Sequence, residues 1–231
     1  MKNKALIVIG LFIAALVMPS CSGGGPESSL LQRYFAAVSM RDNDTMSSIA
    51  LEPLALEVAS WKIVSVSPEK MEPASLPELT KKEAEYKRLL EGHVGPTLDA
   101  KTVLDNATDE LDLARTAAAK AAKKKEVEAA QAKYDEEFNK QKEYQKQYND
   151  AKSAAAREEE VTRFSLGVRE LATIRDLTGT VHSKDVVVSI TPKNGQPKEY
   201  KLPMRMYQLT DTASGAKYPA RWIIISFEPI G

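Results

Sequence analysis

The amino-acid sequence predicts an α+β fold: an antiparallel sheet packed on N-terminal helices, with a long inserted helical hairpin. Segments rich in β-branched and aromatic residues stand near both ends of the chain, over 61–66 and 185–228. Between them, residues 78–165 are rich in Ala, Glu, Lys and Gln, a composition typical of long helices and coiled coils. A lone N-terminal strand cannot form a sheet, so we expect it to pair with the C-terminal strands. The helical segment is then an insertion.

The first 20 residues have the anatomy of a secretory signal. Two lysines, Lys2 and Lys4, precede an apolar stretch over 5–18. Its 14 residues are too few for a transmembrane helix, which needs about 20. Cys21, the only cysteine in the sequence, follows this leader. The next residues are Ser, three Gly and Pro, and they predict a flexible, uncharged tether over 21–26.

The end of the leader resembles the lipobox of bacterial lipoproteins, in which a small residue such as Ser20 precedes the cysteine. The resemblance implies that 1–20 are removed as a signal peptide and that Cys21 becomes a lipidated N-terminus bearing acyl chains such as palmitate. Ser22, in place of aspartate, implies sorting to the outer membrane on its periplasmic side. The alternative is an ordinary cleaved signal, which would leave Cys21 as a free thiol.

The segment after the tether predicts two helices and a strand. Apolar residues recur on one face of a helix that Ser28 or Ser29 would cap. They are Leu30, Leu31, Tyr34, Phe35 and Val38. Asp44 is expected to cap a short second helix, which Pro53 closes. Residues 61–66, WKIVSV, read as a strand.

The helical segment divides into a short helix over 78–91, a break at 92–96 (GHVGP) and a longer part with two coiled-coil seams. Apolar residues follow the alternating three- and four-residue spacing of a seam. The first seam is Leu104, Ala107, Leu111, Ala114, Ala118 and Ala121, and the second is Val127, Ala130, Tyr134, Gln141, Tyr144, Tyr148, Ala151 and Ala155.

The two seams are out of phase. Two residues of slip rotate the apolar stripe by about 200°, so one straight helix could not present both seams to the same partner. We therefore predict an antiparallel hairpin with its tip near 120–126. That tip would bring together three pairs: Ala114 with Tyr134, Leu104 with Tyr144, and Ala100 with Tyr148. A continuous helix with a stutter is the alternative.

The C-terminal region predicts β structure. Residues 185–191 alternate apolar and polar side chains, and Asn194-Gly195 marks a hairpin turn. On the returning strand, one face carries Tyr200, Leu202, Met204 and Met206. The last strand, 221–228 (RWIIISFE), is apolar on both faces and so must be covered on both. The N-terminal helix is one expected cover, and the hairpin root or a second subunit is the other.

Residues 27–76 and 167–231 are therefore expected to form a single α+β domain, with 77–166 as the inserted coiled-coil hairpin. The order of elements resembles the nuclear-transport-factor-two-like (cystatin-like) domains of many small bacterial lipoproteins. The resemblance is carried by residues 34–38 (YFAAV) with 41–44 (RDND), by 61–66, and by 221–224 (RWII). It implies a cone-shaped pocket for a small ligand or an enzymatic reaction, although the long insertion departs from the family pattern.

Few residues suggest chemistry. The two histidines, His93 in the expected break and His182 in an expected strand, have no clustered partners that would predict a metal site. Ser67 and Lys70 match an S-x-x-K pattern without its companion motifs. The acidic run 158–160 reads as a solvated helix face. Asp176, Asp185 and His182 are the available titratable groups of the β region, and no spacing compels them together. We therefore expect no catalytic residue, cofactor or metal.

The charge balance of the chain also narrows the possible functions. Without its leader the chain has 30 basic and 32 acidic residues, which gives no reason to expect a nucleic-acid partner. Four lysines at the expected tip, Lys120, Lys123, Lys124 and Lys125, are candidate contacts for a cell-wall polymer, lipid or acidic protein. Sequence alone thus predicts a non-catalytic envelope lipoprotein that binds or scaffolds through its hairpin. A pocket protein is the alternative, and a homodimer is left open.

Overall fold

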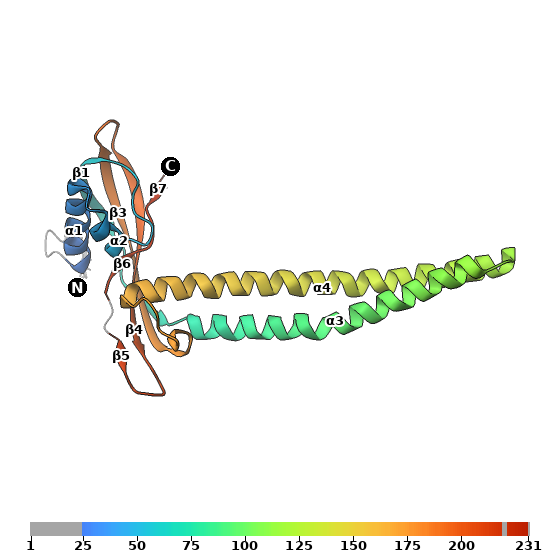
Figure 1. The fold of residues 1–231 in the computed structure, drawn as a ribbon. Coiled ribbons are helices and arrows are strands. Elements are labelled where there is room, and N and C mark those ends of the chain that lie inside the picture. Colours follow the sequence, from blue (N-terminus) through green and yellow to red (C-terminus); the bar gives the residue numbers. More distant parts are fainter. Residues whose placement is uncertain (1–24, 219–220, 231) are drawn as a thin grey trace, which may run out of the picture.

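The computed structural model describes residues 25–218 and 221–230, and the expected signal peptide and lipidation site lie outside this part of the chain. Two helices, two strands, two very long helices and five more strands follow one another along the chain (Figure 1). The helices are α1 (Pro26–Met40), α2 (Asn43–Ile49), α3 (Leu76–Leu113), α4 (Ala117–Leu166) and the 3₁₀ turn η1 (Ile174–Asp176). The strands are β1 (Val58–Val66), β2 (Lys70–Pro73), β3 (Thr178–Pro192), β4 (Lys198–Thr210), β5 (Lys217–Tyr218), β6 (Ile223–Ile224) and β7 (Glu228–Ile230).

The sheet is antiparallel and is built around the long β3–β4 hairpin, whose turn contains Asn194 and Gly195 as predicted. β1 and β2 pair with the outer edge of β3. The short strands β5, β6 and β7 pair with the outer edge of β4. The expected pairing of the N-terminal strand with the C-terminal strands is therefore confirmed. Because α3 and α4 lie between β2 and β3 in the sequence, the helical hairpin is an insertion.

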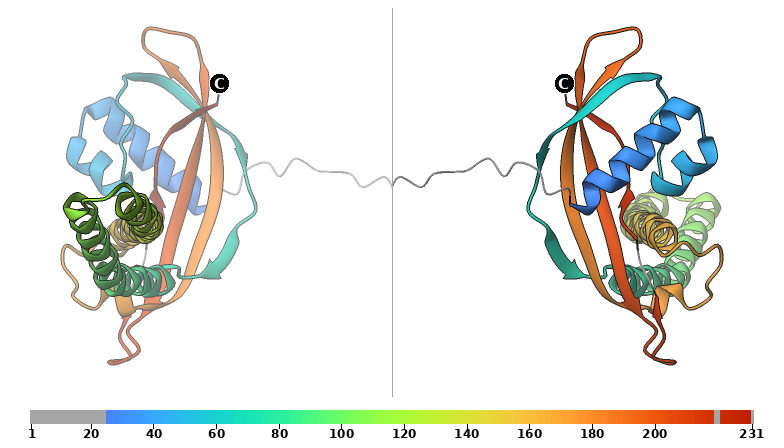
Figure 2. Two further views of the ribbon diagram at one scale, coloured as in Figure 1. Left: turned by 90° about the vertical axis from the view of Figure 1, so that its right-hand side faces the viewer. Right: turned by 90° about the vertical axis from the view of Figure 1, so that its left-hand side faces the viewer.

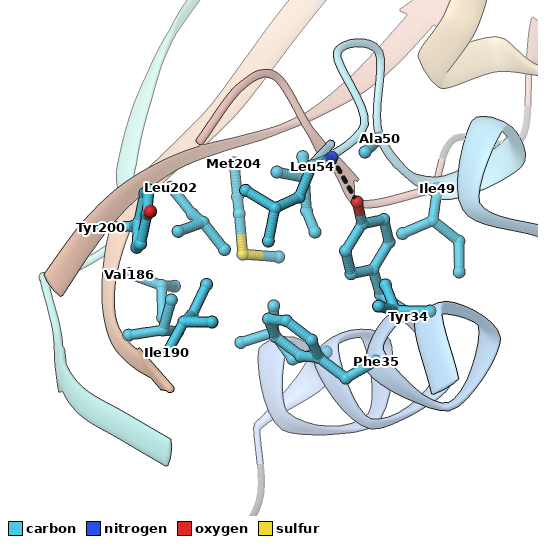
Figure 3. Packing of buried hydrophobic residues seen from close by; sticks show 14 residues of the cluster. Tyr34, Phe35, Ile49, Ala50, Leu54, Val186, Ile190, Tyr200, Leu202 and Met204 are labelled. Carbon is cyan, nitrogen blue, oxygen red and sulfur yellow. Dashed lines mark hydrogen bonds between the residues drawn. The ribbon is translucent and has the colours of Figure 1, made fainter. Parts of the chain in front are cut away.

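One face of the sheet packs against α1 and α2. Alternate residues of β3 and β4 point to this face, and the central ones, Val186, Val188, Leu202 and Met204, have no exposed surface. Tyr34 of α1 is also fully buried, and its hydroxyl accepts a hydrogen bond from the backbone N–H of Leu54 at 2.7 Å (Figure 3). The helical face predicted over residues 30–38 is thus the one that covers the sheet.

The other face of the sheet packs against the root of the helical hairpin. Here Val181, Tyr207 and Leu209 point away from α1 and contact Leu76, Val161 and Leu166 of the two long helices. Residues 223–225 contribute to both sides, since Ile224 belongs to the α1 core while Ile223 and Ile225 belong to the hairpin core. The expectation of a segment covered on both faces is confirmed, with the hairpin root as the second cover.

Three local predictions were wrong. Pro26 is already the first helical residue of α1, and Gly25, rather than a serine, occupies the capping position. Asp42 caps α2 by accepting a hydrogen bond from the backbone N–H of Thr45 at 3.0 Å, so Asp44 lies inside the helix. The expected last strand is divided into β6 and β7, because the segment between them bonds to two different neighbours: Ile225 donates to Pro203 and accepts from Glu52.

The helical hairpin projects from the sheet on the side opposite α1 (Figures 1 and 2). Its arms contain 38 and 50 residues, or about 57 and 75 Å at 1.5 Å per residue. The predicted hairpin is confirmed over the continuous-helix alternative. Its tip was placed wrongly, because the chain turns at residues 114–116 and the segment 120–126 belongs to α4. The turn is stabilised by Thr116, whose hydroxyl accepts a hydrogen bond from the N–H of Ala119 at 3.1 Å.

The predicted break at residues 92–96 is also wrong, because α3 continues through it. Two features of the segment reduce the cost of a proline inside a helix. Gly92 stands four residues before Pro96, at the carbonyl that the proline ring crowds. Gly95 has no Cβ to clash with the ring that follows it. Packing against α4 over the whole arm then outweighs the remaining cost.

Candidate functional site

The hairpin projects far from the sheet (Figure 1), and its two arms meet along a regular seam. In α3 the residues that face α4 recur at alternating three- and four-residue intervals from Leu76 to Ala114. In α4 the second predicted seam matches the buried and half-buried face. The first predicted seam holds only up to Ala114, since Ala118 and Ala121 follow the turn and are exposed.

Contacts between the arms fix their register. The hydroxyl of Thr97, which donates to the carbonyl of His93 in α3 at 3.1 Å, lies 3.4 Å from the backbone carbonyl of Glu137, and Lys123 of α4 reaches Glu110 at 2.6 Å. The ring of Tyr144, expected opposite Leu104, lies instead against His93, with the ring centroids 5.4 Å apart. The three pairings predicted from a tip at 120–126 are therefore wrong, as the true turn is several residues nearer the N-terminus.

A polar contact interrupts the seam at mid-length. His93, which the sequence placed in a break between helices, lies between the arms with 14% of its side chain exposed. Its Nε2 is 3.1 Å from a carboxylate oxygen of Glu137, which is itself nearly buried. Lys133, at 2.5 Å, and Lys140, at 3.8 Å, cover this carboxylate from α4. The hydrogen bond from Lys133 is the main cause that holds the pKa of Glu137 below its usual value.

This mid-length contact was missed from the sequence, although its spacing is regular. Position 137 continues the second seam between Tyr134 and Gln141, and position 93 continues the α3 seam back from Thr97. A charged residue at a seam position predicts a polar contact between the arms, because a buried charge requires a partner.

The four predicted partner-contact lysines lie in the first turns of α4, just beyond the tip. Lys123 is engaged by Glu110 and Glu126, whose hydrogen bonds raise its pKa, Glu110 being the larger cause. Lys124 lies 4.0 Å from Glu128. Lys120 and Lys125 are exposed and form no ion pair with any described residue. The lysines therefore do not act as one free basic cluster.

At its root the hairpin is held to the domain by ion pairs from both arms. Arg175 of η1 bonds to Glu83 of α3 at 2.7 Å and to Glu159 of α4 at 2.6 Å. On the sheet, Arg205 contacts Glu158 at 3.0 Å, and the buried Tyr207 hydroxyl donates to the same carboxylate at 2.8 Å. Burial is the main cause that raises the pKa of Tyr207, and the neighbouring Glu158 adds to it. The acidic run 158–160 is therefore partly a docking element rather than a solvated face.

An open cavity of about 340 Å³ lies over the sheet, lined by β2, the loop before it, β3 and β4. Its lining mixes both charges, including Lys70, Arg205, Glu72 and Asp185. Ser67 and Lys70 of the S-x-x-K pattern both line it, but Lys70 begins β2, so no helical turn brings the two side chains together. The serine hydroxyl instead accepts a hydrogen bond from the N–H of Asp185 at 2.9 Å.

A second set of charges is buried on the α1 face of the sheet. Lys184 lies 3.0 Å from Glu27 at the start of α1 and 3.6 Å from Glu69, and it stands 4.5 Å above the ring of Trp222. Nδ1 of His182 donates a hydrogen bond to a carboxylate oxygen of Glu69 at 2.6 Å, and its buried Nε2 has no partner among the described residues. These contacts tie the start of α1 to the sheet.

The titratable groups singled out in the β region do not converge. His182 and Asp185 stand on opposite faces of β3, because they are an odd number of residues apart in an unbroken register. Asp176 is exposed in η1. Within residues 25–218 and 221–230, no group of three or more His, Cys, Asp or Glu side chains could hold a metal ion, and no helix is long and apolar enough to cross a membrane.

Comparison with known proteins gives no relative from which a function could be transferred. No protein-family model matches the chain, and no curated protein or solved structure is significantly similar to it.

Proposed function

We propose that this chain is a membrane-anchored, non-catalytic scaffolding protein of a bacterial cell envelope, which binds a partner protein through its helical hairpin. The observation that carries the proposal is the isolation of the hairpin beyond its root. In the described chain, every hydrogen bond and ion pair between the hairpin and the domain involves residues no later than Glu83 in α3 and no earlier than Glu158 in α4. The intervening length stabilises nothing except the hairpin itself.

The arrangement of the chain supports an anchor on the opposite side. Cys21 precedes the first residue of α1 by five positions. α1 covers one face of the sheet and the hairpin leaves the other (Figure 2). Acyl chains on Cys21 would therefore hold the α1 side of the domain towards a membrane and direct the hairpin away from it.

The alternative of a pocket protein has less support. The space between α1 and the sheet, where the nuclear-transport-factor-two-like resemblance would place a ligand, is filled by side chains with no exposed surface, among them Tyr34, Val188 and Leu202. The cavity beside β2 is open to solvent and mixes both charges, without a matched set of groups for one reaction.

A photo-crosslinking amino acid at Leu113, tested in intact cells, examines the proposal. Leu113 is the last residue of α3, and Met40, at the end of α1, is a matched control because both side chains are 77% exposed. We expect position 113, but not position 40, to capture one defined envelope protein. Capture of nothing at position 113, or of this chain alone, would contradict the proposed function.

The anchor is tested separately. We expect Cys21→Ser to move the protein from the membrane fraction to the soluble fraction, and mass spectrometry of the unaltered protein to find acyl chains on residue 21. An unmodified N-terminus, or unchanged fractionation of the variant, would refute the anchor while leaving the hairpin experiment interpretable.

A further inference from the structure

A row of polar side chains crosses the sheet beside the hairpin root. Lys70 of β2 is paired with Ser183 of β3, and Ser183 is paired with Arg205 of β4. Directly paired residues share a face of the sheet, and the contact of Arg205 with Glu158 shows that this is the hairpin side. Because neighbouring strands are about 4.8 Å apart, the two basic residues stand about 10 Å apart with the small serine between them.

This row lies in the open cavity of about 340 Å³ beside β2. Asp185 and Glu72 line the same cavity, one row further along β3 and β2 in opposite directions. A smaller cavity of about 160 Å³ continues from it to the hairpin root and shares Glu72, Ser183 and Arg205 with it. We call the two cavities together the β2 trough. Its size is at the lower end of the range for small-molecule sites.

The hairpin root holds Arg205 in place. Its Nη1 donates hydrogen bonds to Glu158 at 3.0 Å and to the hydroxyl of Tyr207 at 3.2 Å. The side chain of Glu158 is 11% exposed and Tyr207 is fully buried, so these partners orient the guanidinium group before any ligand arrives. Its other nitrogens have no hydrogen-bond partner among the described residues, which leaves donors for an acceptor such as a carboxylate.

The remaining charges of the β2 trough have no partner within the described chain. Three exposed side chains form no hydrogen bond or ion pair there: Lys70, Glu72 and Asp185. A simple anion would be repelled by the two carboxylates, and a simple cation by the lysine and the arginine. A ligand that carries both charges would satisfy both sets of groups.

The spacing of the charges fits a ligand of dipeptide length. Asp185 stands two residues along β3 from Ser183, which is a distance of about 7 Å. Two residues of extended peptide span about 7 Å as well. A carboxylate placed over Ser183 would therefore lie between the two basic side chains while the amino group at the other end of the ligand reaches Asp185.

We propose that the β2 trough binds a short peptide with both termini free. Its carboxylate lies between Lys70 and Arg205, and its ammonium group pairs with Asp185. The site is on the opposite face of the sheet from the α1 core, where the nuclear-transport-factor-two-like resemblance would place a ligand. It involves binding without a reaction. The inference goes beyond the proposed function and does not depend on what the hairpin binds.

An NMR titration with L-alanyl-L-alanine tests the class of ligand. The protein is the chain with Cys21→Ser, which removes the acylation site and the only thiol. We expect saturable shifts of the backbone amides of Ser183 and Arg205, with a dissociation constant of about 1 mM or below. The N-acetylated and the C-amidated dipeptides each lack one charge and should bind about fivefold more weakly or worse. Absence of saturable shifts, or equal binding of either blocked peptide, would overturn the proposal.

Two substitutions assign the two ends of the ligand. Lys70→Met should weaken binding of the free dipeptide by about fivefold and leave binding of the amidated one unchanged, because the amide has no carboxylate. Asp185→Asn should weaken binding of the free dipeptide but not of the acetylated one. Both residues are exposed, so the core is not disturbed. Lys62→Met is the control, since Lys62 is an exposed lysine of β1 outside the trough. If it weakens binding as much as Lys70→Met, overall charge and not the trough attracts the dipeptide, and the proposal is wrong.

Discussion

Glu137 shows how a charged side chain is accommodated inside the hairpin. The carboxylate is nearly buried, yet Lys133 donates a hydrogen bond to it at 2.5 Å, and His93 approaches it at 3.1 Å from the other arm. A buried carboxylate without these partners would be costly, because it would lose its hydration with nothing in return. The contact also specifies register, since one step along either helix would separate His93 from Glu137.

The lowered pKa of Glu137 gives stability a defined pH dependence. Its contribution is complete above the ordinary carboxyl value of 4.5 and is lost as the pH falls through the lower value of the folded state. We expect Glu137→Gln to lower the free energy of unfolding near neutral pH and to narrow the difference between neutral pH and about pH 4. Urea unfolding at both pH values measures this.

Glu85→Gln is the control for that experiment. Glu85 is an exposed residue of α3 with no hydrogen bond or ion pair to any described residue. If it changes the pH dependence as much as Glu137→Gln does, the effect belongs to the overall charge and not to the contact between the arms.

At the scale of elements, the sequence predicted the hairpin but not its turn. The phase difference between the two seams predicted a reversal near residues 120–126, whereas the chain turns at 114–116. The alanine-rich segment over 117–122 favours helix equally at every position and so gives no local indication of the turn. The best local signal was Thr116, a good capping residue directly before that run.

The opposite error occurred at residues 92–96, where glycine and proline predicted a break. The regular spacing of His93, Thr97 and Ala100 with Leu104 shows that the seam runs through the segment. Packing of α3 against α4 outweighs the low helix propensity of this segment. An argument from one sequence considers local propensity but not long-range packing. The sheet was easier to predict, because alternation in β3 and β4 and the Asn-Gly turn are local signals that agree with each other.

A proline and a glycine inside α3 should limit its stability. Pro96 is exposed and lacks the N–H that would bond to the carbonyl of Gly92. We expect Pro96→Ala to stabilise the protein by about 2 kcal/mol or more. Once Pro96 is replaced, Gly92→Ala should add about 1 kcal/mol, since a Cβ there would meet nothing within 4 Å. Chemical denaturation measures both changes.

Gly179→Ala provides the contrast on the sheet. At this glycine φ is +150°, and an added Cβ would lie 2.0 Å from the backbone oxygen of Gln208. We therefore expect a loss of about 2 kcal/mol or more. If Pro96→Ala and Gly92→Ala also destabilise, the segment 92–96 has a structural requirement that helix propensity does not describe.

At the scale of the whole molecule, the length of the hairpin can be changed without affecting the folding of the domain. The contacts that hold the hairpin to the domain end at Glu83 and begin again at Glu158. Removing residues 101–107 and 127–133 together takes one heptad from each arm at the same level, so that the seam stays in register. We expect the domain to keep its stability while the hairpin shortens by about 10 Å. Small-angle scattering measures the length, and tip crosslinking should lose its partner.

Removing 101–107 alone is the matched control, because it displaces the two seams relative to each other. That variant should lose stability, with the arms separating near the tip. If the variant with the paired deletion still captures the same partner at the tip, the length of the arms is not needed for binding. The proposed function would then need another basis.

The double fastening of the hairpin root has a mechanical consequence. Arg175 forms hydrogen bonds to both arms, and Arg205 and Tyr207 bind α4 to the middle of the sheet. The arms therefore form a lever with a short, clamped end and a long, free one. A sideways pull at the tip would generate a large torque at these few polar contacts, and from there on Ile223 to Ile225, the segment shared by the two cores. A load applied at the tip would thus be transmitted through the sheet to the face covered by α1.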